Sequence, residues 1–182
     1  MEGGIKAWEG LKAVGAPEAG MAYFTRADRP EALIALAWLL EEGSRKFYSG
    51  LPVLVSDDDA LKLFGRLAAA EEHHKSLLTG LYKSLTGGEP GAGFPGSLLG
   101  GEPKDDTMEG GVRVSEALAW VKGKELHDVL ELALSLEANS YDLYIKMGRA
   151  VPGRDSQEVF RLLTAEEKDH LARLGTLLDK KL

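Results

Sequence analysis

The sequence predicts an all-α fold, a four-helix bundle with one long crossover between its second and third helices. Leu, Ala, Glu and Lys are abundant among the 182 residues while Val and Ile are few, which favours helices over sheet. Residues 31–82 also match residues 127–178 in one gapless register, so the chain contains two copies of a helix-pair unit. Two short connections and one long one then decide how the four helices are joined.

The first helix pair is marked by local signals at its ends. We expect the first helix over about residues 30–50, with Asp28 as its N-cap and Pro30 in its first turn. The second begins near the run 56–59, SDDD, whose side chains can accept hydrogen bonds from free backbone N–H groups. It continues to about residue 84.

The second helix pair follows a Gly- and Pro-rich run from 86 to 111, which is a connection rather than an element. A short helix is expected near 115–121 and the third long helix over about 125–150. A Pro-Gly pair then breaks the chain, and the fourth helix starts near Asp155 and runs to the end. Glu158 would complete a capping box there.

Loop lengths predict the topology. The short links make each helix pair an antiparallel hairpin, whereas the long link can return the chain along helices that are roughly 30–40 Å long. The result is a bundle with one crossover, in which a pseudo-two-fold axis relates the two hairpins.

Composition excludes several classes of protein. The net charge of −7 comes from dispersed acidic residues, which argues against a nucleic-acid partner. The absence of cysteine excludes disulfides, thiolate zinc sites and iron–sulfur clusters. No apolar run is long enough to span a membrane, and the N-terminal residues lack the features of a signal peptide. We therefore expect a cytoplasmic protein.

The repeat includes residues that can bind a metal. Glu41, Glu71 and His74 return at one constant offset as Glu137, Glu167 and His170. On the second and fourth helices these residues lie within stripes of apolar residues at helical spacing, and on the first and third helices the glutamates do the same. The pattern therefore places four glutamates and two histidines inside the bundle.

Buried charge needs compensation, and this predicts the cofactor. Four unpaired glutamates in an apolar interior would be unfavourable or would take up protons, and two imidazoles are too few to pair with them. Two Glu and two Glu-x-x-His motifs supply six oxygen and nitrogen ligands, a set that suits iron or manganese. We expect two iron ions, with manganese or a mixed Fe/Mn pair as the alternative, held by Glu41, Glu71, His74, Glu137, Glu167 and His170.

Residues next to this set have plainer interpretations. Tyr48 and Tyr144 are either core tyrosines or hydrogen-bond partners of the ligand glutamates. Ser44 and Ser140 fit as small core residues. The remaining neighbours point away from the stripes and are expected at the surface: Glu42, Glu72, Glu166, His73 and His127.

The four helices resemble those of the rubrerythrin branch of the ferritin-like superfamily. The resemblance rests on the stretches LLEEGSRKFY, LFGRLAAAEEHHKSLL, LSLEANSYDLY and LLTAEEKDHLARL and extends over about residues 30–180. It implies a ferritin-like di-iron bundle whose metal-centre residues are the six named above. It also implies reduction of hydrogen peroxide and a homodimeric assembly.

Two departures from that family change the expectation. Rubrerythrins carry a cysteine-ligated electron-transfer domain, whereas this chain has no cysteine and must receive electrons from an external donor protein. They also carry a further glutamate one turn after the third-helix ligand, where this chain has Ser140. The site therefore looks symmetric, and the iron-shifting step of the family is not carried over.

The N-terminal segment carries a second resemblance. Residues 3–10, GIKAWEG with the glycine before it, look like the closing segment of a rhodanese domain, so the chain is similar to the C-terminal part of rhodanese–rubrerythrin fusions. The half of a rhodanese that carries the catalytic cysteine is missing, and no sulfurtransferase activity is expected. The expected organisation is a lead-in segment over 1–28 and the di-metal bundle over 29–182.

Three functions fit this sequence. The first is a di-iron peroxidase that reduces hydrogen peroxide with electrons from the external donor, using Tyr48 and Tyr144 beside the metal centre. The second is an O2-dependent ferroxidase or oxidase at the same site. The third is a non-catalytic metal-binding bundle whose ions mainly neutralise the core.

Overall fold

The computed structural model describes residues 29–100 and 106–182, so the predicted lead-in segment over 1–28 lies outside it. The described part contains the helices α2 (Pro30–Gly50), α3 (Asp58–Thr86), α4 (Val114–Val121), α5 (Leu126–Ala150) and α6 (Arg154–Lys181). Three single 3-10 turns accompany them, η1 (Leu51–Val53), η2 (Gly96–Leu98) and η3 (Glu109–Gly111). None of these helices combines the length and the apolar character that a bilayer span requires.

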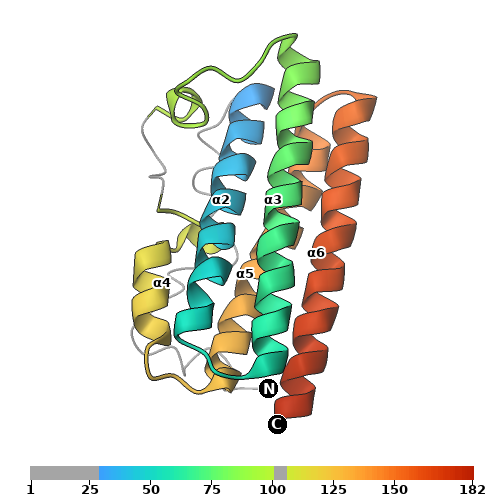
Figure 1. Ribbon diagram of the computed structural model, residues 1–182. Coiled ribbons are helices and arrows are strands. Elements are labelled where there is room, and N and C mark those ends of the chain that lie inside the picture. Colours follow the sequence, from blue (N-terminus) through green and yellow to red (C-terminus); the bar gives the residue numbers. More distant parts are fainter. Residues whose placement is uncertain (1–28, 101–105) are drawn as a thin grey trace.

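The predicted all-α bundle with one long crossover is confirmed. α2 packs on α3, α5 packs on α6, and α3 also contacts α6. The crossover leaves the upper end of α3 and reaches α4, which lies beside α2 at the opposite end of the bundle (Figure 1). The chain therefore enters α5 at the end of the bundle where α2 finishes, and α5 runs antiparallel to α2 (Figure 1). The short links between α2 and α3 and between α5 and α6 make each of these pairs an antiparallel hairpin.

The helix ends follow local chemistry, with two corrections. The N-cap of α2 is Arg29, which makes no side-chain cap hydrogen bond, so the prediction of Asp28 as the N-cap is wrong. Asp57 caps α3, since its Oδ1 accepts from the Ala60 N–H at 3.0 Å. The predicted capping box on α6 is wrong: Gly153 is the N-cap, so Glu158 falls too far along the helix to reach back. Glu158 instead pairs with Arg161 at 2.6 Å.

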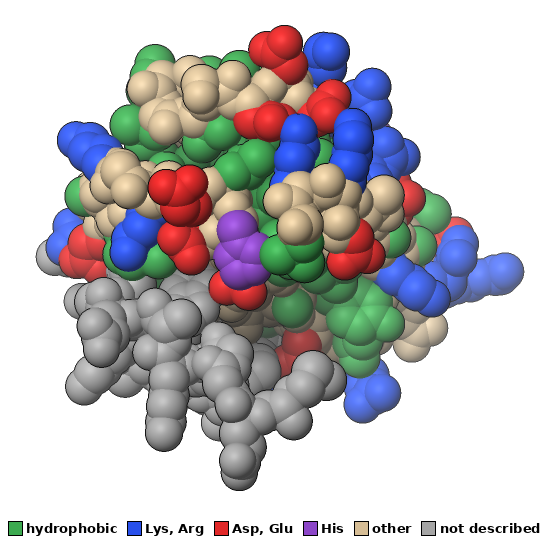
Figure 2. Space-filling model, turned by 90° about the horizontal axis from the view of Figure 1, so that it is seen from below, with side chains coloured by type: hydrophobic (Ala, Val, Ile, Leu, Met, Phe, Trp, Pro, Cys, Tyr) green, Lys and Arg blue, Asp and Glu red, His purple; other side chains and the backbone are tan. Residues whose placement is uncertain are grey.

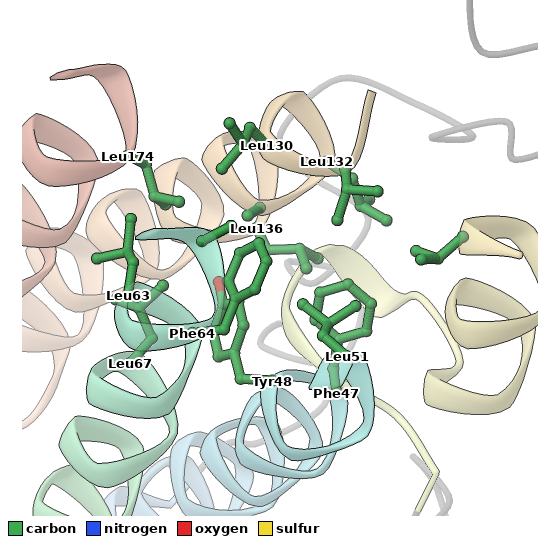
Figure 3. Packing of buried hydrophobic residues seen from close by; sticks show 14 of the residues in the cluster. Phe47, Tyr48, Leu51, Leu63, Phe64, Leu67, Leu130, Leu132, Leu136 and Leu174 are labelled. Atoms are coloured by element: carbon green, nitrogen blue, oxygen red, sulfur yellow. The ribbon is translucent and has the colours of Figure 1, made fainter. Parts of the chain in front are cut away.

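Two hydrophobic clusters fill the interior and reveal the internal symmetry. The first contains Tyr48, Phe64 and Leu67 together with Leu130 and Leu136, and Figure 3 shows the Tyr48 and Phe64 rings side by side at its centre. Their ring centroids are 6.1 Å apart. The second cluster holds the equivalent residues of the other copy: Tyr144, Phe160, Leu163, Ile34 and Leu40. Equivalent positions of the two repeat copies thus fall in opposite clusters, as a two-fold relation between the hairpins requires.

Ion pairs join α3 and α6 at the end of the bundle where α6 finishes. Lys180 lies 2.6 Å from Asp59, and Lys181 lies 2.7 Å from Asp57. Acidic and basic side chains stand next to one another on this end of the molecule (Figure 2). Exposed pairs of this kind contribute under about 1 kcal/mol each, so the apolar clusters carry most of the stability.

The crossover approaches α2 at a glycine, which yields a first prediction. A Cβ at Gly43 would overlap the Thr107 carbonyl oxygen and lie 2.7 Å from the Met108 Cα. Gly43→Ala should therefore lower the free energy of unfolding by about 1–3 kcal/mol in urea denaturation, because backbone atoms must move. Gly80→Ala, on α3 with nothing within 4 Å, is the matched control and should gain about 0.5–1 kcal/mol. Equal effects of the two changes would show that this contact is loose.

Candidate metal centre

A polar layer lies between the two hydrophobic clusters, and it contains the six predicted residues. Glu41 comes from α2, Glu137 from α5, and the two Glu-x-x-His pairs from α3 and α6. All six side chains are buried, from 0% exposed for Glu41 to 7% for His170. The helical stripes therefore bring four carboxylates and two imidazoles into one interior site.

The six residues form two overlapping groups. One ligand atom from each of Glu41, Glu71, His74 and Glu167 lies within 4.8 Å of the others, and the same holds for Glu71, Glu137 and His170. Glu71 belongs to both groups. Glu167 belongs to the first and also lies 3.2 Å from His170 Nδ1. These two repeat-related glutamates therefore stand between the two groups, where a carboxylate could bridge two ions.

His74 has the surroundings of a metal-ligating imidazole. Its Nδ1 lies 3.3 Å from Glu41, 3.1 Å from Glu71 and 3.2 Å from Glu167. Its Nε2 lies 2.9 Å from the carboxylate of Glu166. Ligating histidines commonly donate the N–H of the second ring nitrogen to such a carboxylate, which fixes the tautomer and leaves the first nitrogen free to bind.

The site is less symmetric than predicted, and Glu166 is one reason. Glu166 lies at the surface as expected, with its side chain 40% exposed, but from there its carboxylate also reaches His74 on α3. The equivalent position in the other copy is Ala70, which offers His170 no such partner. His170 Nδ1 lies 2.9 Å from Glu137, and the two imidazole rings stack 5.6 Å apart. The two halves of the site thus have the same candidate ligands, but only His74 has a carboxylate partner for its second ring nitrogen.

The two tyrosines also behave differently. Tyr48 is fully buried and its hydroxyl donates to Glu137 Oε1. Tyr144 is 1% exposed, but Glu41 Oε1, the corresponding acceptor, has no hydrogen-bond partner. Of the two alternatives for these tyrosines, hydrogen bonding to a ligand glutamate therefore fits Tyr48, and Tyr144 packs on Phe160 as a core residue.

The remaining neighbours lie mostly as expected. His73 and Glu72 are exposed, while Glu42 is half-buried beside Arg45 and Lys75. Ser44 and Ser140 are both buried. The partly exposed group His127, Asp128 and Glu131 at the start of α5 has the geometry of a cation site, but exposed acidic groups of this kind are common without an ion.

A fifth buried glutamate was missed by the sequence reasoning. Glu109 lies in η3, within the crossover, and is 2% exposed. Neither of its carboxylate oxygens has a hydrogen-bond partner. An acidic residue followed by two glycines in a long connection normally indicates an exposed turn, and no periodicity marks it as interior.

The electrostatics of the site follow from crowding of like charges. Burial, reinforced by the charge of Glu137, raises the pKa of Glu167 to about 8. Burial and the charge of Glu71 raise the pKa of Glu41 and of Glu109. Burial alone would lower the pKa of His170, but hydrogen bonds and charges from Glu137 and Glu167 raise it to about 10. Protons therefore offset the negative charge when no metal is bound.

These shifts predict how the metal-free protein responds to pH. Glu167 and His170 bind protons more tightly when folded, so their stabilisation is complete below their ordinary pKa values and is lost as pH rises through about 8 and about 10. Glu42 acts oppositely: its hydrogen bond from Arg45 lowers its pKa to about 2, and its contribution is lost as pH falls toward that value. We expect the free energy of unfolding of chelator-treated protein to be greatest near about pH 5 and to decline toward pH 10. Urea denaturation across this range checks it; stability that rises from pH 5 to pH 9 would refute it.

The donor set fits metal ions. Glu41 Oε1, Glu167 Oε1 and both oxygens of Glu109 are buried without hydrogen-bond partners, and buried polar atoms are ordinarily paired. Each of these carboxylates could satisfy its free oxygens by binding a cation. The Glu41, Glu71, His74 and Glu167 group and the Glu137 and His170 group could therefore each hold a metal ion, with ligands typical of iron or manganese.

Comparisons with known proteins bear on the fold alone. No protein-family model matches the chain, and a comparison with curated proteins finds no match either. The solved structure of a hypothetical protein from Pyrococcus furiosus is similar, with a TM-score of 0.62 and 21% sequence identity. The match covers 83% of this chain and 89% of that one. At this identity the likeness supports the helical arrangement described above.

Proposed function

We propose that this protein is a di-iron oxidoreductase that reduces hydrogen peroxide to water with electrons from an external donor protein. The observation that supports the proposal is the pair of buried Glu/His groups that share Glu71, because two ions held by shared carboxylates would be close enough to act on one small ligand. The resemblance of the four helices to rubrerythrins points to the same chemistry. By that resemblance we also propose a homodimer.

The reaction needs two electrons and two protons for each peroxide that becomes two waters. Two iron ions, when bound, would supply the two electrons.

Two further hydrogen bonds orient residues of the site. The Tyr48 hydroxyl donates its proton to Glu137 Oε1, and His74 Nε2 donates its proton to Glu166. These protons fix Glu137 and His74 in ligating orientations. The hydrophobic clusters on both sides of the layer exclude bulk water, which strengthens each electrostatic interaction.

Anaerobic stopped-flow mixing separates this function from the alternatives. Protein loaded with Fe(II) should be oxidised much faster by hydrogen peroxide than by O2. Faster oxidation by O2 would replace the proposal with ferroxidase or oxidase chemistry. If neither oxidant reacts while bound metal still raises the melting temperature, the bundle is a non-catalytic metal-binding protein.

A further inference from the structure

Within residues 29–100 and 106–182, Glu109 is the one buried carboxylate near the site that the proposed metal set does not use. It is 2% exposed, and both of its oxygens lack a hydrogen-bond partner. An ionised carboxylate in such a place is strongly unfavourable unless a proton or a cation compensates it. The fold nevertheless holds the residue inside the bundle.

Backbone contacts within the crossover hold Glu109 in this buried position. Thr107 pairs with Arg113 in an isolated antiparallel bridge, and the Met108 N–H donates to the Val112 carbonyl at 2.9 Å. Gly110 then takes a φ of 71°, a left-handed conformation that favours glycine. These contacts fix the backbone on both sides of Glu109 in a tight turn.

The contacts on either side of Glu109 show where it enters. Met108 packs against Gly43 on α2, and Gly110 lies against the side-chain nitrogen of Asn139 on α5. Gly43 and Asn139 are equivalent positions in the repeat, and each lies two residues after a predicted ligand, Glu41 or Glu137. Glu109 therefore enters between α2 and α5, at the pseudo-two-fold axis. In keeping with this, the charges of Glu71, Glu167 and Glu137 all act on its carboxyl group.

We propose that Glu109 is a further carboxylate ligand of the metal centre, contributed by the crossover rather than by a helix. This inference rests on the proposed function for the existence of a metal pair. It gives the centre a fifth carboxylate at the axis. It also breaks the symmetry of the site, since the repeat has no second copy of this residue. The free oxygens of Glu109 are the ones that a cation would satisfy.

Mn2+ binding by the full-length chain tests the assignment. Glu109→Gln keeps the shape and removes the charge, and Glu116→Gln on the exposed face of α4 is the matched control. We expect Glu109→Gln to weaken Mn2+ binding at least about tenfold in competition with a chelating dye. Its metal-free melting temperature should stay unchanged or rise, because an unpaired buried acid is removed. The control should match the wild type in both measurements.

The outcomes separate this inference from the proposed function. Wild-type protein that binds two Mn2+ ions while Glu109→Gln binds them equally well would overturn the role of Glu109 alone. Weaker binding together with a lower metal-free melting temperature would assign the effect to folding and would also overturn it. Wild-type protein that binds no Mn2+ and no Fe2+ would overturn both.

Discussion

Stripping the metal from this protein should lower its melting temperature by about 10–20 °C. An ion present at one hundred times its dissociation constant stabilises the folded state by about 2.7 kcal/mol, so two ions contribute about 5 kcal/mol. For a chain of this size each kcal/mol shifts the melting temperature by about 2–4 °C. Differential scanning calorimetry of chelator-treated and Fe(II)-loaded or Mn(II)-loaded protein measures the difference.

Calcium serves as the control, because it prefers more oxygen ligands and longer bonds than this Glu/His site offers. It should restore little of the lost stability. A metal-free bundle that melts within a degree or two of the loaded one would mean that protons alone compensate the buried glutamates.

Glu71→Ala should abolish binding at both metal positions, whereas Glu41→Ala should abolish only one. The reason is that Glu71 belongs to both groups of ligand atoms and Glu41 to one. We therefore expect fewer than one ion per chain in the first variant and about one in the second, with peroxide reduction reduced at least about 100-fold in each, since chemistry that needs two metals fails when either is lost. Metal analysis after gel filtration and steady-state assays with peroxide measure the two effects.

Glu72→Ala is the matched control, since Glu72 is the next residue on α3 and is exposed. Its loss removes an exposed partner of Lys75 and of Arg45. Glu42 still pairs with both, at 2.6 Å and 2.8 Å. Metal content and activity should match the wild type. If Glu71→Ala retained one tightly bound ion, Glu71 would not bridge the two positions.

Helical periodicity explains why so much of the fold and of the site could be predicted from sequence. Residues three and four positions apart share a face, so the stripes that bury Phe64 and Leu67 necessarily bury Glu71 and His74. The repeat strengthened this prediction, because the same apolar stripe with its Glu-x-x-His motif occurs in both copies.

The burial of Glu109 and the contact of Glu166 with His74 were not predicted, because helical periodicity does not encode them. Glu109 lies in an irregular segment, and its burial follows from the way Thr107 and Met108 dock on Gly43, a contact between distant parts of the chain. Glu166 lies at the surface as expected, but its contact with His74 could not be predicted, because an angle on one helix does not show whether a neighbouring helix lies within reach. The break in symmetry follows from these two residues, neither of which has an acidic counterpart in the other copy.

The most direct test of the account is to locate the metals in crystals of the loaded protein. Anomalous diffraction at the iron or manganese edge should show two peaks about 3.5–4 Å apart in the polar layer, flanking the carboxylates of Glu71 and Glu167. A protein that yields no peak there after loading with either metal would contradict the claim that divalent ions compensate the buried glutamates.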